Sequence, residues 1–112
     1  MSNDSKRISD KDITERTLVK VREYTSFFCE IIAEHYNIIC KYPPSKVANA
    51  CFYLARQCCH LRTVWSFDLE EYTGYSEGNL SEILRDIRYH CRDIIELIDY
   101  ANNNFREGPR AD

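Results

Sequence analysis

One run of apolar residues constrains the fold of this chain more than any other feature. Between residues 80 and 98, apolar side chains recur at steps of three and four residues, which places them on one face of an α-helix. Ser76 is a suitable N-cap, and the chain turns polar beyond Asp99. We therefore predict one long amphipathic helix, whose apolar face comprises Leu80, Ile83, Leu84, Ile87, Cys91, Ile94, Ile95 and Ile98.

A second segment, from Ser45 to Cys59, is apolar on most of its sides. One helical stripe contains Val47, Ala50, Cys51, Leu54 and Cys58, and another contains Ala48, Phe52, Ala55 and Cys59. A helix that is apolar nearly all round is a buried one, so we expect this segment to form the centre of the fold. The small side chains of Ala48, Ala50 and Ala55 would allow neighbouring helices to approach closely.

Two further helices complete the prediction. The first begins at a cap formed by Thr14 or Thr17, ends near Tyr36-Asn37, and has an apolar face made by Leu18, Val21, Tyr24, Phe28, Ile31, Ile32 and His35. Pro43-Pro44 separates it from the central helix. A short helix from Phe67 to Thr73 follows, with Ser66 as its N-cap and Gly74 in the left-handed conformation just past its end.

Composition agrees with an all-α fold. The chain has 112 residues but contains 3 Gly and 3 Pro, too few for a turn-rich sandwich or barrel. Its length suits a single domain. We expect four to five helices around a central buried helix, in one domain over residues 14–104. Residues 1–13 are expected to be a polar tail or a linker, and residues 105–112 a polar tail.

Charge and hydropathy exclude several classes of function. The formal net charge is −3 and the isoelectric point is about 5.6, which argues against nucleic acid as a partner. Apolar runs are far shorter than the roughly 20 residues that a membrane-spanning helix needs. The polar start of the chain lacks a signal-peptide pattern, so we expect a location in the nucleus, the cytoplasm or both.

Residues that carry chemistry are present but are not arranged for it. The sequence contains no phosphate-binding loop, no nucleophile elbow and no His-Glu-x-x-His motif, and His35, His60 and His90 lie in separate segments. Without a signal peptide or metal-ligand spacing, the six cysteines are interpreted as small buried hydrophobic residues: Cys29, Cys40, Cys51, Cys58, Cys59 and Cys91. We expect no catalytic residue, metal or cofactor. A metal- or thiol-dependent enzyme is the least favoured alternative.

Two segments in this order and spacing resemble a known family. The first runs from Tyr42 to Arg56 (YPPSKVANACFYLAR), and the second contains Trp65, Leu69 and Tyr72-Thr73-Gly74-Tyr75-Ser76, followed by Leu80. Together they resemble the C-terminal cyclin box of the cyclins, most closely that of the mitotic A- and B-type members. The positions that carry the resemblance are Tyr42, Pro43, Pro44, Ser45, Ala48, Ala50, Leu54, Ala55, Trp65, Leu69, Thr73, Gly74, Tyr75 and Leu80.

The resemblance implies both a fold and a function. A cyclin box is a domain of five helices with one helix wrapped by the others, and its last helix is short and basic. Here, only Asn102 to Glu107 remain for that helix before Gly108-Pro109. The implied function is that of a non-enzymatic module, part of or derived from an activator of a cyclin-dependent protein kinase in cell-cycle control.

The residues that the family uses to contact its kinase lie in an N-terminal cyclin box, whose motifs do not occur in this sequence. No kinase-binding residue can therefore be assigned from the resemblance. The alternative is a stand-alone cyclin-fold adaptor that binds other proteins without activating a kinase. In either case, an apolar face left exposed could make the isolated domain self-associate.

Overall fold

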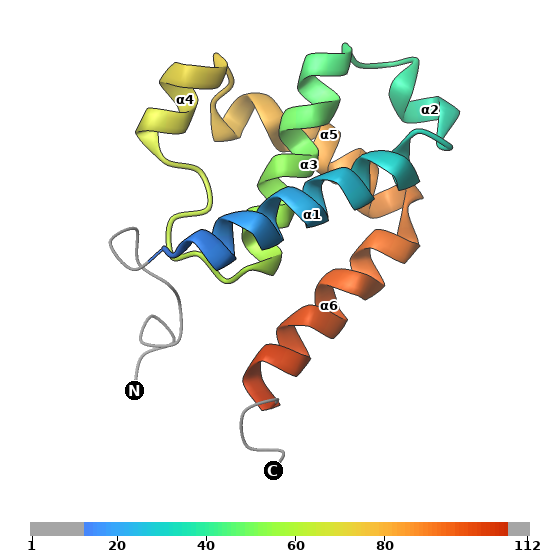
Figure 1. Cartoon of the computed structure of the whole chain (residues 1–112). Helices are drawn as coiled ribbons and strands as arrows, with labels where there is room; N and C mark the ends of the chain where they lie inside the picture. Colours follow the sequence, from blue (N-terminus) through green and yellow to red (C-terminus); the bar gives the residue numbers. More distant parts are fainter. Residues whose placement is uncertain (1–12, 108–112) are drawn as a thin grey trace.

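Helices joined by short turns and loops make up residues 13–107, the part of the chain that the computed structural model describes; side-chain surroundings are described for residues 13–100. No strand occurs in this part, which confirms the prediction of an all-α fold. The helices are shown in Figure 1 and are α1 (Glu15–Ile32), α2 (Tyr36–Ile39), α3 (Pro44–Cys58), α4 (Phe67–Thr73), α5 (Glu77–His90) and α6 (Arg92–Glu107).

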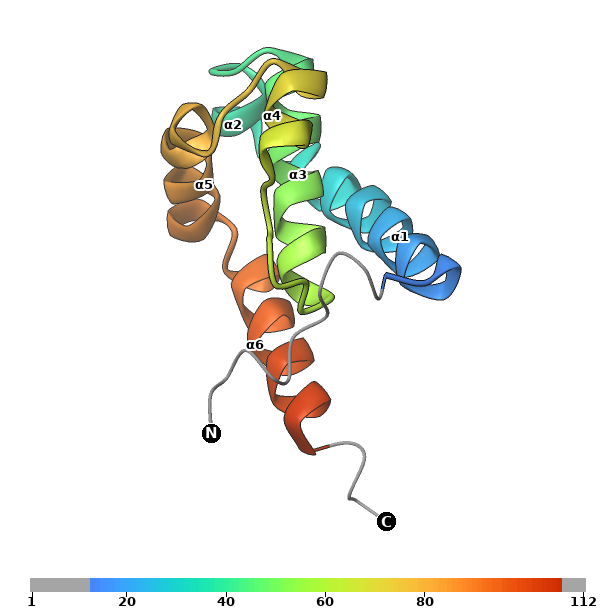
Figure 2. The same ribbon diagram turned by 90° about the vertical axis from the view of Figure 1, so that its left-hand side faces the viewer.

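Helix α3 lies at the centre, as the sequence predicts. Figure 2 shows it between α1 on one side and α5 on the other. Ala50, Cys51, Leu54 and Ala55 are completely inaccessible to solvent, and α3 contacts α1, α2, α5 and α6. Because Ala50 and Ala55 carry only a methyl group, adjacent helices approach closely there. Ala48 does not share this role, although we expected it to: it is exposed, because α1 crosses α3 beyond the first turns of α3.

Helix α1 begins as predicted but ends earlier. The Thr14 hydroxyl accepts a hydrogen bond from the Thr17 backbone N–H, which confirms the cap. The helix stops at Ile32 rather than near Tyr36-Asn37, and a turn leads into the four-residue α2. In a continuous helix, Ile38 would lie about 240° round from Ile32, away from the buried face. The turn allows Ile32 and Ile38 both to be buried.

Two further details of α1 differ from its predicted apolar face. Leu18 is 49% exposed. Tyr24 is partly buried, whereas Phe28 is completely buried.

The prediction of one long helix beyond Ser76 is wrong. The helix breaks at Cys91, whose backbone has φ −113° and ψ 72°, and α6 starts at the next residue. A straight helix over residues 77–107 would be about 46 Å long, whereas α3 is about 22 Å long. The break redirects the chain, so Ile87 in α5 and Ile94 in α6 are both fully buried. Helix α6 also includes residues 102–107, where the resemblance placed a further helix.

Local capping agrees with the sequence prediction in the second half of the chain. The Ser66 hydroxyl accepts a hydrogen bond from the Leu69 backbone N–H at the start of α4. Gly74, with φ 82°, ends α4 in the left-handed conformation. Ser76 and Asn79 form a reciprocal capping box at the start of α5. These caps determine where α4 stops and α5 begins.

Replacing Leu54 by alanine tests the central position of α3. The side chain is fully buried, so we expect Leu54→Ala to lower the free energy of unfolding by about 2–5 kcal/mol. The matched control is Leu18→Ala, the same change at a half-exposed position, where we expect a loss under about 1 kcal/mol. Denaturant unfolding followed by circular dichroism measures both. Equal losses would contradict the assignment of the core.

Replacing Gly74 by valine tests the left-handed cap. A Cβ at this position meets no atom within 4 Å, so any cost must come from the backbone. We expect Gly74→Val to destabilise the protein by about 1–2 kcal/mol, because a β-branched residue is strained at positive φ. Gly78→Ala is the control: Gly78 lies in the first turn of α5, and an added Cβ makes an ordinary 3.7 Å contact. A thermal midpoint unchanged in Gly74→Val would rule out the strain.

Candidate functional site

Tyr75 is the centre of a hydrogen-bond network that joins α3, α4 and the start of α5. Its hydroxyl lies 2.7 Å from the Ser45 hydroxyl, and its backbone N–H donates to the Thr73 hydroxyl over 3.1 Å. Its carbonyl accepts a bond of 2.8 Å from the indole N–H of Trp65. Four of the residues that carry the family resemblance are therefore neighbours in space, although 30 positions separate Ser45 from Tyr75.

The Trp65 ring and the Arg56 guanidinium hold the loop between α3 and α4 against α3. Trp65 packs against Phe52 and Tyr53, with ring centroids 5.8 Å and 5.9 Å away. Arg56, which is 8% exposed, donates to the carbonyls of Val64 and Thr63 over 2.6 Å and 2.8 Å. Hydrogen bonds from a charged donor are stronger than neutral ones, so this loop is well anchored.

Sequence reasoning missed the role of Arg56. The available signal was a single charged residue directly after the buried pair Leu54-Ala55 in an otherwise apolar segment. A charge in that position needs partners when the helix is buried. The partners, however, are main-chain carbonyls of the following loop, which have no sequence signature.

A second polar cluster connects the segment before α3 to α5. The Asp86 carboxylate accepts hydrogen bonds from the Tyr42 hydroxyl (2.5 Å) and the Lys41 ammonium (3.0 Å). These donors hold the pKa of Asp86 below its usual value. Burial, followed by the bond to Asp86, raises the pKa of Tyr42 to about 12. Both groups therefore keep their ordinary charge at neutral pH, and the cluster joins the segment before α3 to α5.

The remaining residues of the resemblance occupy structural positions. Pro43 is the N-cap of α3, and Pro44 is its first residue. Leu80 is fully buried, and Leu69 is partly buried against the core. The Thr73 hydroxyl donates to the Leu69 carbonyl over 2.7 Å. Together these residues shape the domain, and they do not converge on one exposed binding site.

The six thiols differ in how far they are buried. Cys51, Cys58, Cys59 and Cys91 are buried, Cys29 is partly buried, and Cys40 is exposed, so the interpretation of all six as buried residues is wrong for Cys40. Burial raises the pKa of Cys58 to about 12 and that of Cys91 to about 11, and raises the pKa of Cys51 still further. A thiol that keeps its proton is a poor nucleophile and a poor metal ligand. Within residues 13–100, no three His, Cys, Asp or Glu side chains are grouped closely enough to hold a metal ion.

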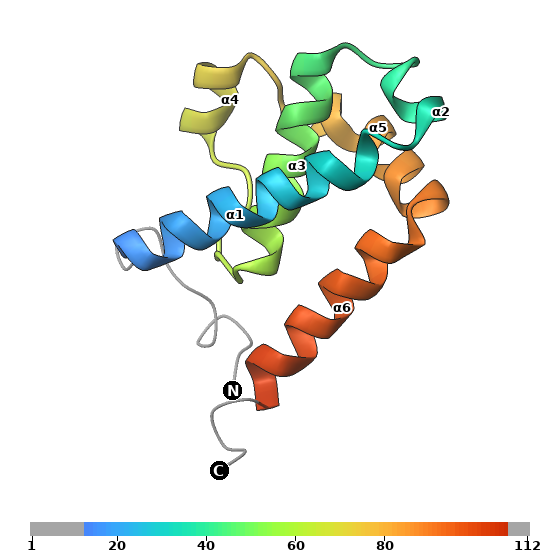
Figure 3. The same ribbon diagram turned by 45° about the vertical axis from the view of Figure 1, so that its right-hand side comes forward.

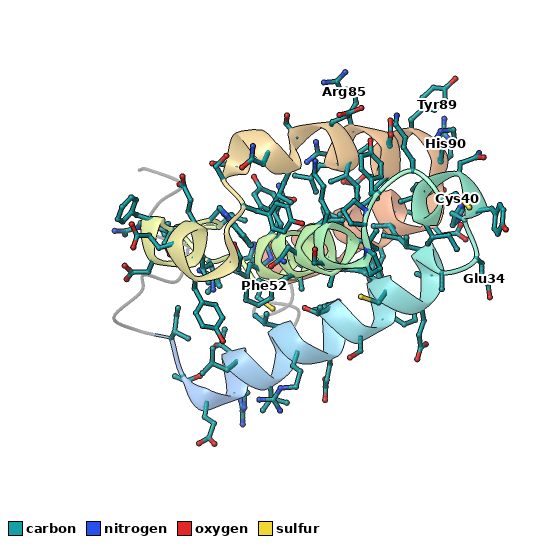
Figure 4. All side chains as sticks on the ribbon, turned by 90° about the horizontal axis from the view of Figure 1, so that it is seen from above. Glu34, Cys40, Phe52, Arg85, Tyr89 and His90 are labelled. Atoms are coloured by element: carbon teal, nitrogen blue, oxygen red, sulfur yellow. The ribbon has the colours of Figure 1, made fainter. Side chains whose placement is uncertain are left out.

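The surface offers apolar contact area. One groove lies between α1 and α3, where Phe52 is placed between the two helices (Figure 4); Leu18, Thr25 and Arg22 also line it. Another lies where α1 and α6 diverge (Figure 3), and it is lined by Lys20, Glu23, Tyr24, Phe27 and Leu97. Phe27 is 48% exposed there. In the described part of the chain, no helix combines the length and the apolar character that crossing a bilayer requires.

Comparison with known proteins identifies the family. The family model for the cyclin C-terminal domain matches residues 5–104, which is most of the chain. The chain belongs to the cyclin family. It is 36% identical over 82 residues to a mouse cyclin-J-like protein and 29% identical over 70 residues to cyclin-B1-1 of Arabidopsis thaliana. These alignments cover 73% and 62% of the chain, but 19% and 16% of the two relatives. No solved structure gave a significant match.

The match confirms the resemblance that the two sequence segments indicated. It supports a cyclin-type regulatory role, and cyclin membership points to a regulatory rather than an enzymatic protein. The structure agrees with the all-α cyclin-box fold, including its central helix.

Chemical modification of the thiols tests which cysteine side chains are buried. At pH 8, we expect iodoacetamide to modify Cys40 first and Cys29 more slowly, while the four buried thiols react only after denaturation, because they are inaccessible and protonated. Peptide mass spectrometry locates each adduct. In the control variant Cys40→Ser, the fast phase should disappear. Rapid modification of Cys51 or Cys58 in the folded protein would contradict the assignment.

Proposed function

We propose that this domain is a non-enzymatic part of an activator of a cyclin-dependent protein kinase. The observation that carries the proposal is the match of residues 5–104 to the cyclin C-terminal domain. The burial and high pKa values of four of its thiols support a role that needs no catalytic group. In this proposal, the domain works in the nucleus, the cytoplasm or both, where such kinases act.

Kinase contact is proposed to run through an N-terminal cyclin box, with this domain packed against that box. The large apolar residues that α1 leaves exposed are consistent with such packing: Leu18 at 49%, Val19 at 38% and Phe27 at 48%. An apolar surface of this kind gains free energy when a partner removes it from water. The same residues would support association of two copies if the partner box were absent.

Affinity capture from the native cells tests this function. An antibody to the domain should co-purify a protein kinase, and intact-mass analysis should show whether the captured chain is larger than the 13.3 kDa of this sequence. An epitope-tagged Leu54→Asp version is the matched control: a charge in the fully buried Leu54 site should unfold the domain, remove its packing against the N-terminal box and thereby reduce capture of the kinase.

The outcomes separate the proposal from its alternative. A kinase captured by the wild-type chain and lost with the Leu54→Asp variant supports the proposal. Capture of other proteins, with no kinase in repeated experiments, would overturn it and favour a stand-alone cyclin-fold adaptor.

A further inference from the structure

Helix α4 has seven residues, and none of them is buried. Leu69 is partly buried and joins the helix to the core. Figure 4 shows α4 at one end of the molecule, with side chains extending away from the other helices. Two aromatic rings point into solvent there: Phe67 is 69% exposed and Tyr72 is 89% exposed. The helix therefore presents an unpartnered face.

Helix stability does not account for these rings. The ends of α4 are already satisfied by the Ser66 cap and by Gly74 in the left-handed conformation. Phenylalanine and tyrosine are only moderate helix formers, and exposed aromatic area costs free energy until a partner covers it. Aromatic side chains are enriched at protein interfaces.

Carboxylates surround both rings. On a helix, residues three and four apart are neighbours, so Glu70 and Glu71 lie beside Phe67, and Asp68 lies beside Tyr72. All three carboxylates are exposed, and none forms an ion pair with any residue whose side chain the structure describes. Asp68 and Glu70 also lie in the first turn, where negative charges interact favourably with the helix dipole. This interaction does not explain the presence of Glu71 or of the two exposed rings.

The acidic character is concentrated in this part of the chain. Residues 63–84 contain five acidic residues and no Lys, Arg or His, so the rest of the chain has a net charge of +2, although the whole chain carries −3. Of the five, Glu82 pairs with Lys41, and Glu77 accepts a hydrogen bond from Tyr53. Among the residues that the structure describes, none pairs with the three carboxylates of α4, which leaves these free to attract a positively charged partner.

We propose that the exposed surface of α4 (Phe67, Asp68, Glu70, Glu71 and Tyr72), which extends round more than half of the helix, binds an arginine-containing segment of a partner protein. A guanidinium can stack on an aromatic ring and donate two parallel hydrogen bonds to a carboxylate, whereas a lysine ammonium is a point charge. The negative charge repels nucleic acids and anionic lipid surfaces. This proposal does not rest on the proposed role in kinase activation. Binding to α4 can be measured on this chain alone, without a kinase.

Peptide binding tests the chemistry of the partner. The full chain is titrated into a fluorescein-labelled peptide of alternating arginine and serine, followed by anisotropy, alongside peptides with lysine or glutamate in place of arginine. We expect the arginine peptide to bind at least about threefold more tightly than the lysine peptide, and the glutamate peptide not to bind. Affinity should fall as the salt concentration rises. Equal affinity for arginine and lysine, or no binding of the arginine peptide, would overturn the proposal.

Variants locate the surface. Phe67→Ala combined with Tyr72→Ala, and separately Asp68→Asn combined with Glu71→Gln, should each weaken binding by about tenfold, because each pair supplies one half of the recognition. The matched control is Tyr89→Ala: Tyr89 is 79% exposed on α5 but lies between Arg88 and His90, so binding should not change. A loss of affinity for Tyr89→Ala equal to that of the α4 variants would place the peptide elsewhere.

A folding control and a mapping experiment complete the test. All variants should keep the thermal midpoint within a few degrees of wild type, because the altered side chains are exposed. In the wild-type chain, amide resonances of residues 66–77 should shift on addition of the arginine peptide. Shifts confined to residues outside α4 would contradict the proposed site.

Discussion

The burial of α3 between α1 and α5 is the constraint on which the rest of the structure depends. Its residues Ala50, Cys51, Leu54 and Ala55 have no solvent-accessible surface, and α1 makes its most extensive helix contact with α3. A helix covered on several sides must be apolar on several sides, and it needs small residues where backbones come close. The same constraint explains why α1 turns at Ile32 and why the last apolar stripe is divided at Cys91, since each change brings another isoleucine to the core.

Polar contacts then fix the elements that lack a large apolar face. Arg56 and Trp65 hold the loop before α4, and Tyr75 connects this loop to α3 and α5. The hydrogen bonds of Tyr42 and Lys41 to Asp86 connect the turn before α3 to α5. Each of these contacts joins residues that lie in different elements, so together they favour one arrangement of the short elements around the core. They give structural roles to several residues typical of a cyclin box, among them Tyr42, Trp65 and Tyr75.

The electrostatic properties of the molecule divide it into two functional parts. In the interior, burial keeps the thiols protonated and removes their reactivity. On the surface, acidic residues gather around α4, while apolar residues are exposed along α1. The surfaces of α1 and α4 therefore differ in chemical character, one apolar and the other acidic and aromatic.

The sequence by itself determined the all-α class, the central helix, the bounds of α4 and the caps at Ser66, Gly74 and Ser76, because helical periodicity and capping are local properties. It also indicated the cyclin family from two short segments. Only the tertiary structure decided the break at Cys91, the exposure of Ala48 and Leu18, and the partners of Arg56 and Asp86. Cys91 is neither proline nor glycine, so no local rule ends a helix there; the limited length of α3 does. Contacts between residues distant in the sequence, such as Tyr42 and Asp86, form only once the helices have packed.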